Sequence, residues 1–187
     1  MSDKPRQLPL TLPARPELAL IGPQGAGKTH LAHVWAGETG ATILRPDQIG
    51  SLDTAALPAG QHLVIDDADR LAPGAEVALL HLHNHVLAGG GRILFTGRSA
   101  PFRWPVALPD LASRLQACAT ATLQEPDEML LSAVLVKLFA DRQVRVSPSL
   151  IGYLVSRMER SLGMANTLVA RLDALALARG GAISRAL

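Results

Sequence analysis

The segment GPQGAGKT, residues 22–29, constrains the fold of this chain more than any other stretch of the sequence. It follows ELALIG (17–22), a short apolar run typical of a buried strand. It leads into GKTHLAHVWAGETG (27–40), which predicts a helix that ends at Gly40. The spacing fits G-x-x-x-x-G-K-[ST], a motif that requires this strand–turn–helix context. We therefore expect an α/β fold in which this turn joins a strand to a helix.

The same segment is typical of a phosphate-binding loop. Glycines let backbone N–H groups approach phosphate oxygens, and the amino terminus of the following helix adds partial positive charge. Lys28 is expected to reach the β- and γ-phosphates, and the Thr29 hydroxyl to bind Mg²⁺. The alternative is a glycine-rich turn that only joins strand to helix. The predicted nucleotide-binding residues of the loop are Gly22, Gly25, Ala26, Gly27, Lys28 and Thr29.

Two acidic residues follow a second apolar run, LVIDD at residues 63–67. A carboxylate at the end of a buried strand can hold the Mg²⁺ of a nucleotide, and a second one can orient the attacking water. We predict that Asp66 binds Mg²⁺ together with Thr29 and that Asp67 is the catalytic residue that orients the water. The alternative is an Asp pair that caps the next helix. The phosphate-binding motif upstream favours the metal site.

The remaining periodicity predicts two kinds of structure. Strands are expected at 41–45, 61–67, 92–97 and 119–123, with a helix at 74–89, and this alternation predicts a parallel sheet covered on both faces. After Pro126 only helices are predicted. Their apolar faces are marked by Leu130, Val134 and Leu138, by Leu150, Leu154 and Met158, and by Leu168, Leu172 and Leu175. We expect an extended tail (1–14), an α/β nucleotide-binding module (15–124) and a small all-helical module (125–187).

Composition places the chain among cytoplasmic proteins. Eighteen Lys and Arg residues against sixteen Asp and Glu give a net charge of +2, and without a Lys/Arg-rich run this is weak evidence for nucleic-acid binding. The single cysteine, Cys118, cannot form an internal disulfide or a Cys-based zinc site. No secretory signal and no apolar run long enough for a membrane helix is present, so we expect no membrane partner.

The histidine-rich stretch HLHNH, residues 81–85, is a candidate metal-binding site. On a helix His81 and His85 share a face, whereas His83 points away, so only two ligands would converge. We expect polar positions on a helix and no metal site.

Three stretches together resemble the AAA+ ATPase family around the bacterial replication initiator DnaA: GPQGAGKTHLAHVWA, HLVIDDADRL and LPDLASRL. Within that family the chain is similar to the Hda-type regulators, which consist of a short tail and the AAA+ module. The resemblance covers nearly the whole chain from Gln7 onward. It implies a P-loop AAA+ module whose parallel five-stranded sheet has the order 5-1-4-3-2 and is flanked by helices, with a small C-terminal helical lid.

The resemblance also implies roles for two residues outside the loop. In the family, DLASRL carries an arginine finger that is presented to the nucleotide of a neighbouring subunit, which makes Arg114 a catalytic residue in trans. Without the resemblance, a helix-end arginine in a surface salt bridge would be preferred. Thr96 in FTGRS corresponds to the polar residue that senses the nucleotide.

Three departures from the family pattern concern the nucleotide. The family usually has a longer segment that cradles the adenine base, where this chain has only residues 13–17. The family often has an acid where this chain has Arg98, and it has a lid arginine where this chain has Met164, with Arg160 the nearest cation. We therefore expect ADP or ATP with Mg²⁺ to be bound, and weak or no intrinsic ATPase activity.

The N-terminal ribbon QLPLTL, residues 7–12, matches in full a Q-L-x-L-x-L peptide of the Hda-type proteins. In those proteins the peptide docks in the hydrophobic cleft of the DNA sliding clamp. The resemblance thus implies a clamp-binding tail. A packed edge strand is the alternative, because edges tolerate proline. The predicted clamp-binding residues are Gln7, Leu8, Leu10 and Leu12.

The combined prediction is a regulator of replication initiation. It would bind the sliding clamp, contact ATP-bound DnaA and promote hydrolysis of that ATP, which prevents over-initiation; a homo-oligomer is compatible with this. No helix-turn-helix module follows the last predicted helix, so we expect no direct sequence-specific DNA binding. The first alternative is an autonomous AAA+ ATPase that remodels replication proteins like a helicase loader. The second, a small-molecule kinase, is disfavoured by the Asp66–Asp67 pair and the helical module.

Overall fold

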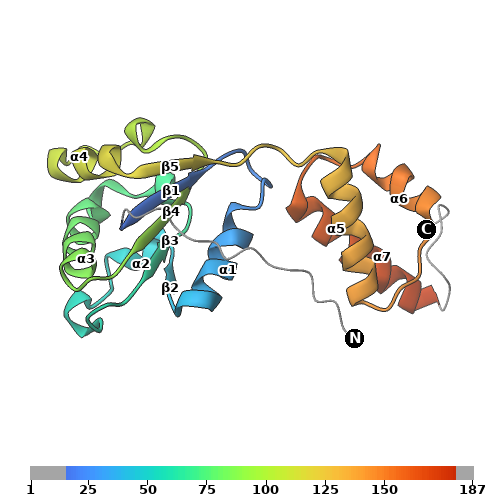
Figure 1. Ribbon diagram of the computed structural model, residues 1–187, viewed down its shortest axis with the longest axis horizontal. Helices are drawn as coiled ribbons and strands as arrows, with labels where there is room; N and C mark the ends of the chain where they lie inside the picture. The colour runs from blue at the N-terminus through green and yellow to red at the C-terminus, as the bar shows by residue number, and fades with distance from the viewer. Residues whose placement is uncertain (1–15, 180–187) are drawn as a thin grey trace. The chain divides into compact units, whose positions relative to one another are not determined.

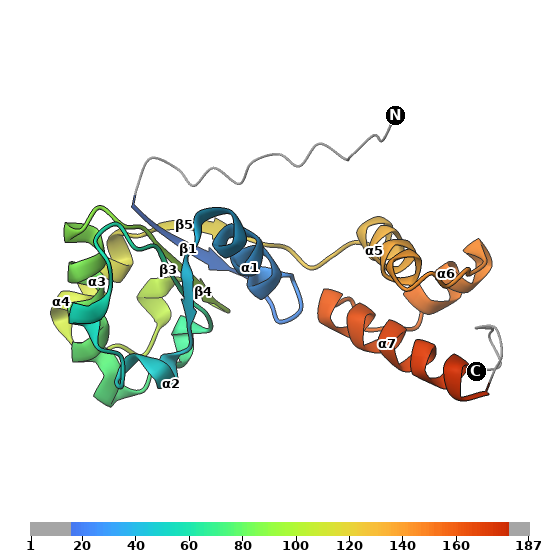
Figure 2. The same ribbon diagram turned by 90° about the horizontal axis from the view of Figure 1, so that it is seen from below.

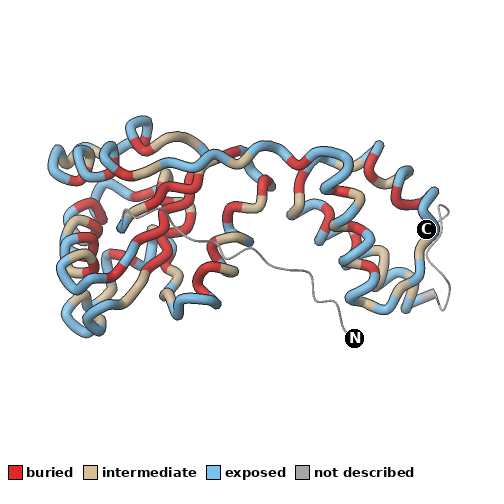
Figure 3. Tube along the Cα trace, in the orientation of Figure 1, coloured by how far each residue is buried: buried red, intermediate tan, exposed pale blue. Residues whose placement is uncertain are grey.

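The computed structural model describes residues 16–179, and these form two compact units. The described part of the first unit comprises residues 16–21 and 28–122. The second comprises the glycine loop, residues 22–27, and the chain from Leu123 onward. Each unit has its own hydrophobic core, and Figure 3 shows the buried residues along the strands and along the helices. The predicted clamp-binding ribbon lies outside the described residues.

The first unit is built on a parallel five-stranded sheet of order β2-β3-β4-β1-β5 (Figure 1). Counted from the other edge this is 5-1-4-3-2, so the predicted fold is confirmed. All residues of β3 and β4 are buried, as expected for parallel strands covered on both faces. The strands are β1 (Glu17–Ile21), β2 (Thr42–Leu44), β3 (Leu63–Ile65), β4 (Ile93–Gly97) and β5 (Ala119–Thr122).

Helices cover both faces of this sheet. Figure 2 shows α1 on one face, with α3 and α4 on the other. The apolar sides of α3 and α4 bury Leu79, Leu82, Leu111 and Leu115 in the core of the unit. Because all five strands are parallel, their carboxyl ends lie at one common edge of the sheet. Ligands of α/β sheets bind at this edge. The helices are α1 (Lys28–Thr39), α2 (Pro46–Ile49), α3 (Glu76–Ala88) and α4 (Pro109–Ala117).

The second unit contains three helices, α5 (Glu128–Asp141), α6 (Pro148–Val155) and α7 (Leu162–Arg179). Each begins behind a polar side chain that accepts a backbone N–H three residues further on; these side chains are Asp127, Ser147 and Ser161. No helix within residues 16–179 is long and apolar enough to cross a membrane. The buried core consists of Leu131, Leu135, Phe139, Leu150, Ile151, Val155, Ala165 and Val169.

The buried stripe of α5 differs from the predicted one. Leu130 is 46% exposed, and Val134 and Leu138 only border the core. The core side instead carries Leu131, Leu135 and Phe139. The predicted and the observed sets of residues both have helical spacing, because apolar residues occupy adjacent positions of α5. Spacing alone therefore did not identify which set is buried. The same holds in α7, where Ala165 and Val169 are buried and Leu175 is 41% exposed.

Strand β3 is shorter than predicted, Leu63–Ile65 rather than 61–67. The strand ends because Asp67 adopts a left-handed backbone conformation, with φ of 56°. This conformation is uncommon for residues other than glycine, but Asp is one of the side chains that tolerate it best. The turn gives the two acidic residues different surroundings.

Candidate functional site

Three of the predicted site residues are joined by hydrogen bonds in the first unit. Thr29 Oγ1 donates to the carboxylate of Asp66, 3.1 Å from each oxygen, and Thr96 Oγ1 donates to Asp66 Oδ1 at 2.6 Å. They come from α1, from the residue after β3 and from β4. They meet because β3 and β4 are neighbours in the sheet. Thr96 is fully buried and Asp66 nearly so. We call these residues the Thr–Asp–Thr cluster.

Asp67 lies beside this cluster but faces outward. Its backbone N–H donates to Thr96 Oγ1 at 2.9 Å, while its side chain is 40% exposed and lies 3.6 Å from Arg70 Nη1. A hollow of about 230 Å³ opens next to it, between Arg45, Asp47 and Arg70. A hollow of this size holds several water molecules. Asp67 is therefore placed where it can contact water, whereas Asp66 is turned inward.

Lys28, the first residue of α1, is only 7% exposed. Burial is the main reason that the pKa of its ammonium group is lowered, because it disfavours the charged form. The nearby carboxylates of Asp67, Asp69 and Asp66 raise this pKa, and the charge of Arg98 lowers it further. The net lowering means that these carboxylates only partly compensate the buried charge.

The glycine loop is packed against the start of α7 within the second unit. The Gly25 carbonyl accepts the Leu162 N–H at 2.9 Å. Gly25 has φ of 80°, and a Cβ there would collide with Ser161 Oγ; a Cβ on Gly22 would collide with the Leu123 carbonyl oxygen. Side chains are thus excluded at both positions. Ala26 and Gly27 complete the loop, and Gly27 is directly followed by Lys28.

Met164 and Arg160, the two positions that the resemblance singled out near the C-terminus, lie in the second unit. Met164 is 40% exposed, and its backbone N–H donates to Ser161 Oγ. Arg160 Nη2 lies 2.8 Å from Glu128 Oε1, so the nearest cation is engaged in an ion pair.

Arg114 is exposed on α4 between the buried residues Leu111 and Leu115. Within residues 16–179 it forms no ion pair, so the structure does not engage it in the alternative surface salt bridge. The segment leading into α4 is anchored by Glu76. This buried carboxylate accepts the N–H of Ala107 at 3.0 Å and that of Leu108 at 2.6 Å. Glu76 was not predicted as a site residue: its place at the start of an apolar helix is visible in the sequence, but its distant partners are not.

The cluster is chemically suited to Mg²⁺. This ion prefers hard oxygen ligands and is usually held by one or two carboxylates together with substrate phosphates and waters. Asp66 and Thr29 offer such oxygens side by side. In the described part of the chain, no three His, Cys, Asp or Glu side chains gather into an all-protein metal site.

The three histidines of α3 have separate environments. His81 is exposed, and His85 Nε2 lies 3.2 Å from the Leu57 carbonyl oxygen. His83 is buried, with Nε2 3.0 Å from Glu17 Oε1 on β1. The residue expected to point away from the shared face therefore points into the protein.

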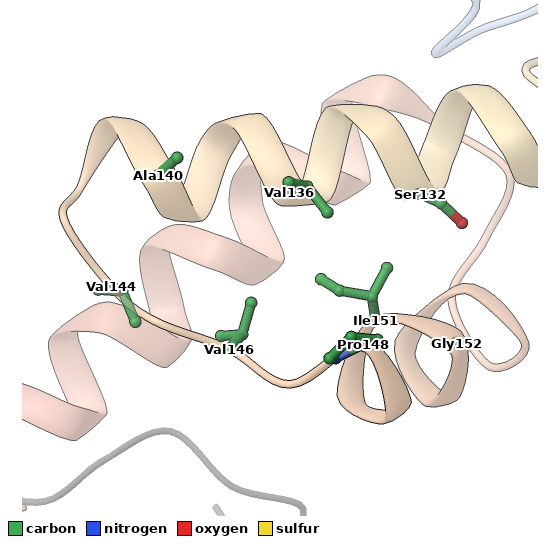
Figure 4. Close-up of a pocket in the computed structure, with 8 residues that line it drawn as sticks. All are labelled: Ser132, Val136, Ala140, Val144, Val146, Pro148, Ile151 and Gly152. Carbon is green, nitrogen blue, oxygen red and sulfur yellow. The ribbon is translucent and has the colours of Figure 1, made fainter.

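A groove of about 560 Å³ lies in the second unit between α5 and α6 (Figure 4). Ser132 contributes the one hydroxyl among its described lining side chains, and none of them is charged. The groove is therefore unsuited to phosphate chemistry. The lining residues are Ser132, Val136, Ala140, Val144, Val146, Pro148, Ile151 and Gly152.

No protein-family model matches the sequence, and no curated protein matches it. Solved structures do match. Domain III of the replication initiation protein DnaA from Thermotoga maritima superposes with a TM-score of 0.70 at 19% identity, covering 89% of this chain and 79% of that one. A replication initiator DnaA bound to AMPPCP and single-stranded DNA gives a TM-score of 0.68 at 16% identity, covering 89% and 59%.

The P216G mutant of RuvB from Thermotoga maritima is equally similar, with a TM-score of 0.69 at 19% identity and coverage of 90% and 58%. The chain thus spans about three fifths of the length of the RuvB chain and of the DnaA chain bound to AMPPCP. At these identities the likeness shows the fold alone, which is shared with these DnaA and RuvB chains.

Proposed function

We propose that this chain is a nucleotide-binding AAA+ protein of DNA replication that regulates the initiator DnaA. The observation that carries the proposal is the Thr–Asp–Thr cluster at the carboxyl edge of an AAA+ sheet. Similar folds belong to DnaA chains, one of them bound to AMPPCP and single-stranded DNA. The nucleotide would be ADP or ATP.

Each site residue has a role that its surroundings support. The backbone of residues 22–27 and the Lys28 ammonium would bind the phosphates. Thr29 and Asp66 would hold Mg²⁺, which when bound neutralises phosphate charge. Asp67 would orient a water from the adjoining hollow. Thr96 keeps Asp66 and the Asp67 backbone in place.

Arg114 would act on the nucleotide of another protein. It is exposed, and a guanidinium group can form two parallel hydrogen bonds to phosphate oxygens. Placed against the ATP of DnaA, it would stabilise the charge of the transferring phosphoryl group and so accelerate hydrolysis. The segment before α4 is held by Glu76, which limits the positions that α4 can take.

The tail would bring this activity to the sliding clamp. Gln7, Leu8, Leu10 and Leu12 form an apolar, proline-spaced ribbon. Proline restricts the unbound chain, which lowers the entropy lost on docking. This part of the proposal rests on the sequence alone.

The test is hydrolysis of DnaA-bound ATP, measured with and without this protein and DNA-loaded clamp. Stimulation that requires both is expected. Arg114→Ala should remove it while leaving nucleotide and clamp binding intact, whereas Arg92→Ala, at another exposed arginine of the same unit, should have no effect. Changing Leu10 and Leu12 to Ala should abolish clamp binding without lowering the melting temperature. Normal stimulation by Arg114→Ala would refute the finger assignment.

One observation favours a second candidate, the autonomous ATPase that remodels replication proteins. The chain has its own Asp67 beside a water-accessible hollow and an intact Thr–Asp–Thr cluster. Strong basal hydrolysis that is stimulated by DNA and lost in Asp67→Asn would favour this candidate over the regulator.

A further inference from the structure

The connection between β4 and α4 presents an aromatic side chain to solvent. Phe102 is the central residue of a short 3₁₀ turn, Pro101–Arg103. Pro101 and Trp104 on either side of it are buried, whereas Phe102 itself is 64% exposed. Single exposed apolar side chains are common on protein surfaces, so exposure alone assigns no role to Phe102. The surroundings of the turn decide the question.

The turn is held rigidly against the sheet. The Trp104 ring packs edge-on against Phe95 of β4, with ring centroids 6.1 Å apart, and its Nε1 donates to the Ser99 carbonyl oxygen at 2.8 Å. A Cβ on Gly97 would lie only 2.8 Å from this ring, so the glycine permits the close approach. The backbone at Phe102 is therefore fixed before any partner binds, which lowers the entropy lost on docking.

Further apolar residues are exposed beside this turn. Pro105 and Ala107 follow it in the chain, and Val77 at the start of α3 is 56% exposed. Glu76, the neighbour of Val77, accepts the N–H of Ala107 and so joins the two segments. An exposed apolar surface with an aromatic residue is typical of a protein interface. We call these exposed residues the Phe102 surface: Val77, Phe102, Pro105 and Ala107.

The charges around the Phe102 surface favour an acidic partner. The guanidinium carbon of Arg103 lies 5.4 Å from the centroid of the Phe102 ring. Arg114 is exposed on α4, the helix that packs against the turn. Within residues 16–179 neither arginine forms an ion pair, and Asp110 is the one acid between them in the sequence. A second copy of this chain would bring like charges together, so symmetric self-association through this surface is disfavoured.

We propose that Phe102 anchors this chain on the protein whose ATP Arg114 acts on, by entering an apolar pocket that carboxylates border. This rests on the proposed function, in which that protein is DnaA. Aromatic and arginine side chains that become buried contribute most of the binding energy in many protein interfaces, which suits Phe102 and Arg103 to this role. Phe102 then holds the partner, while Arg114 acts on its nucleotide. Binding and rate are therefore separable.

The experiment measures two quantities on the full chain with DNA-loaded clamp. One is the dissociation constant for AMPPCP-bound DnaA, and the other is the maximal rate of hydrolysis of DnaA-bound ATP when this chain is saturating. Phe102→Ala should weaken binding about thirtyfold and leave the maximal rate unchanged. Phe102→Leu, which stays apolar, should weaken binding less. Arg114→Ala should remove the stimulated rate with a smaller loss of affinity.

The control is Met129→Ala, which shortens an apolar side chain that is 78% exposed in the second unit. It should change neither quantity. The melting temperatures of Phe102→Ala and Phe102→Leu should match that of the wild type, because an exposed side chain contributes little to the core. Binding of a labelled oligo(dT) is measured in parallel, since an aromatic side chain beside arginines also suits base stacking.

Four results would overturn the inference. Unchanged DnaA binding by Phe102→Ala, with stimulation by the wild type intact, would show that Phe102 does not contact DnaA. Loss of the maximal rate without loss of affinity would make it a support of Arg114. A lowered melting temperature would assign it a structural role. Loss of oligo(dT) binding alone would assign the surface to single-stranded nucleic acid. If the wild type does not bind DnaA, the proposed function itself fails, which is a distinguishable outcome.

Discussion

Replacing Thr96 by Val tests the Thr–Asp–Thr cluster directly, because the two side chains have nearly the same shape. The substitution removes the hydroxyl that donates to Asp66 at 2.6 Å and accepts the Asp67 N–H at 2.9 Å. Thr96 is fully buried, so water does not replace either bond in the folded protein.

The cost can be worked out from these two bonds. A hydrogen bond to a charged group contributes about 1.5–3 kcal/mol, and a buried N–H left without an acceptor costs about 1–3 kcal/mol. Because Thr29 still donates to Asp66, we take the lower end of each range and expect a loss of about 2.5 kcal/mol in the free energy of unfolding. For a chain of this size, that lowers the melting temperature by about 5–10 °C.

The chain offers a convenient assay and control. Its two tryptophans, Trp35 and Trp104, both lie in the first unit, so tryptophan fluorescence during urea unfolding reports on the unit that carries Thr96. Thr96→Ser keeps the hydroxyl and loses one methyl group, at a cost of about 1 kcal/mol. If Thr96→Val were no less stable than Thr96→Ser, the hydroxyl would not be what holds the two acidic residues.

Two further predictions concern buried charges. Lys28→Met should stabilise the nucleotide-free protein at pH 7 while abolishing nucleotide binding, because burial lowers the pKa of this amine and its charged form is therefore disfavoured on folding. The wild type recovers this stability as pH rises through the lowered pKa, so urea unfolding should show the advantage of Lys28→Met vanishing near and above 10.5, the unperturbed value. Glu76→Gln should lower the free energy of unfolding by about 2 kcal/mol, since the charge that accepts the Ala107 and Leu108 N–H groups is lost. It should also weaken stimulation of DnaA by Arg114; full stability together with full stimulation would contradict the anchoring role.

Local patterns predicted the sheet and most of the cluster. The loop motif, the Asp pair after a buried strand and the alternation of strands and helices each depend on residues close in sequence. Thr96 was assigned through the family resemblance, and the structure supplies its physical reason: its hydroxyl links Asp66 to the Asp67 backbone.

Interactions between segments that are distant in the chain could not be predicted from the sequence. Glu76 bonds to residues 31 and 32 positions away, and no local pattern predicts such a partner. The close contact of buried His83 with the partly buried Glu17 joins α3 to β1 in the same way. The bond from the Arg98 backbone N–H to Asp69 Oδ2 likewise spans 29 positions and is visible only in the folded chain.

The central position of β1 in the sheet has a consequence for biosynthesis. Leu18 pairs with Leu94 on one side and Ala119 on the other, so its partners are made roughly 75 and 100 residues later. Strands this far apart in the chain pair slowly, because the intervening chain must lose conformational entropy before the contacts between the strands form. A nascent chain that has not yet produced β5 leaves one edge of β1 unpaired, and such edges promote association with other chains. Early termination before residue 119 should therefore yield aggregation-prone fragments, whereas termination after β5 should not.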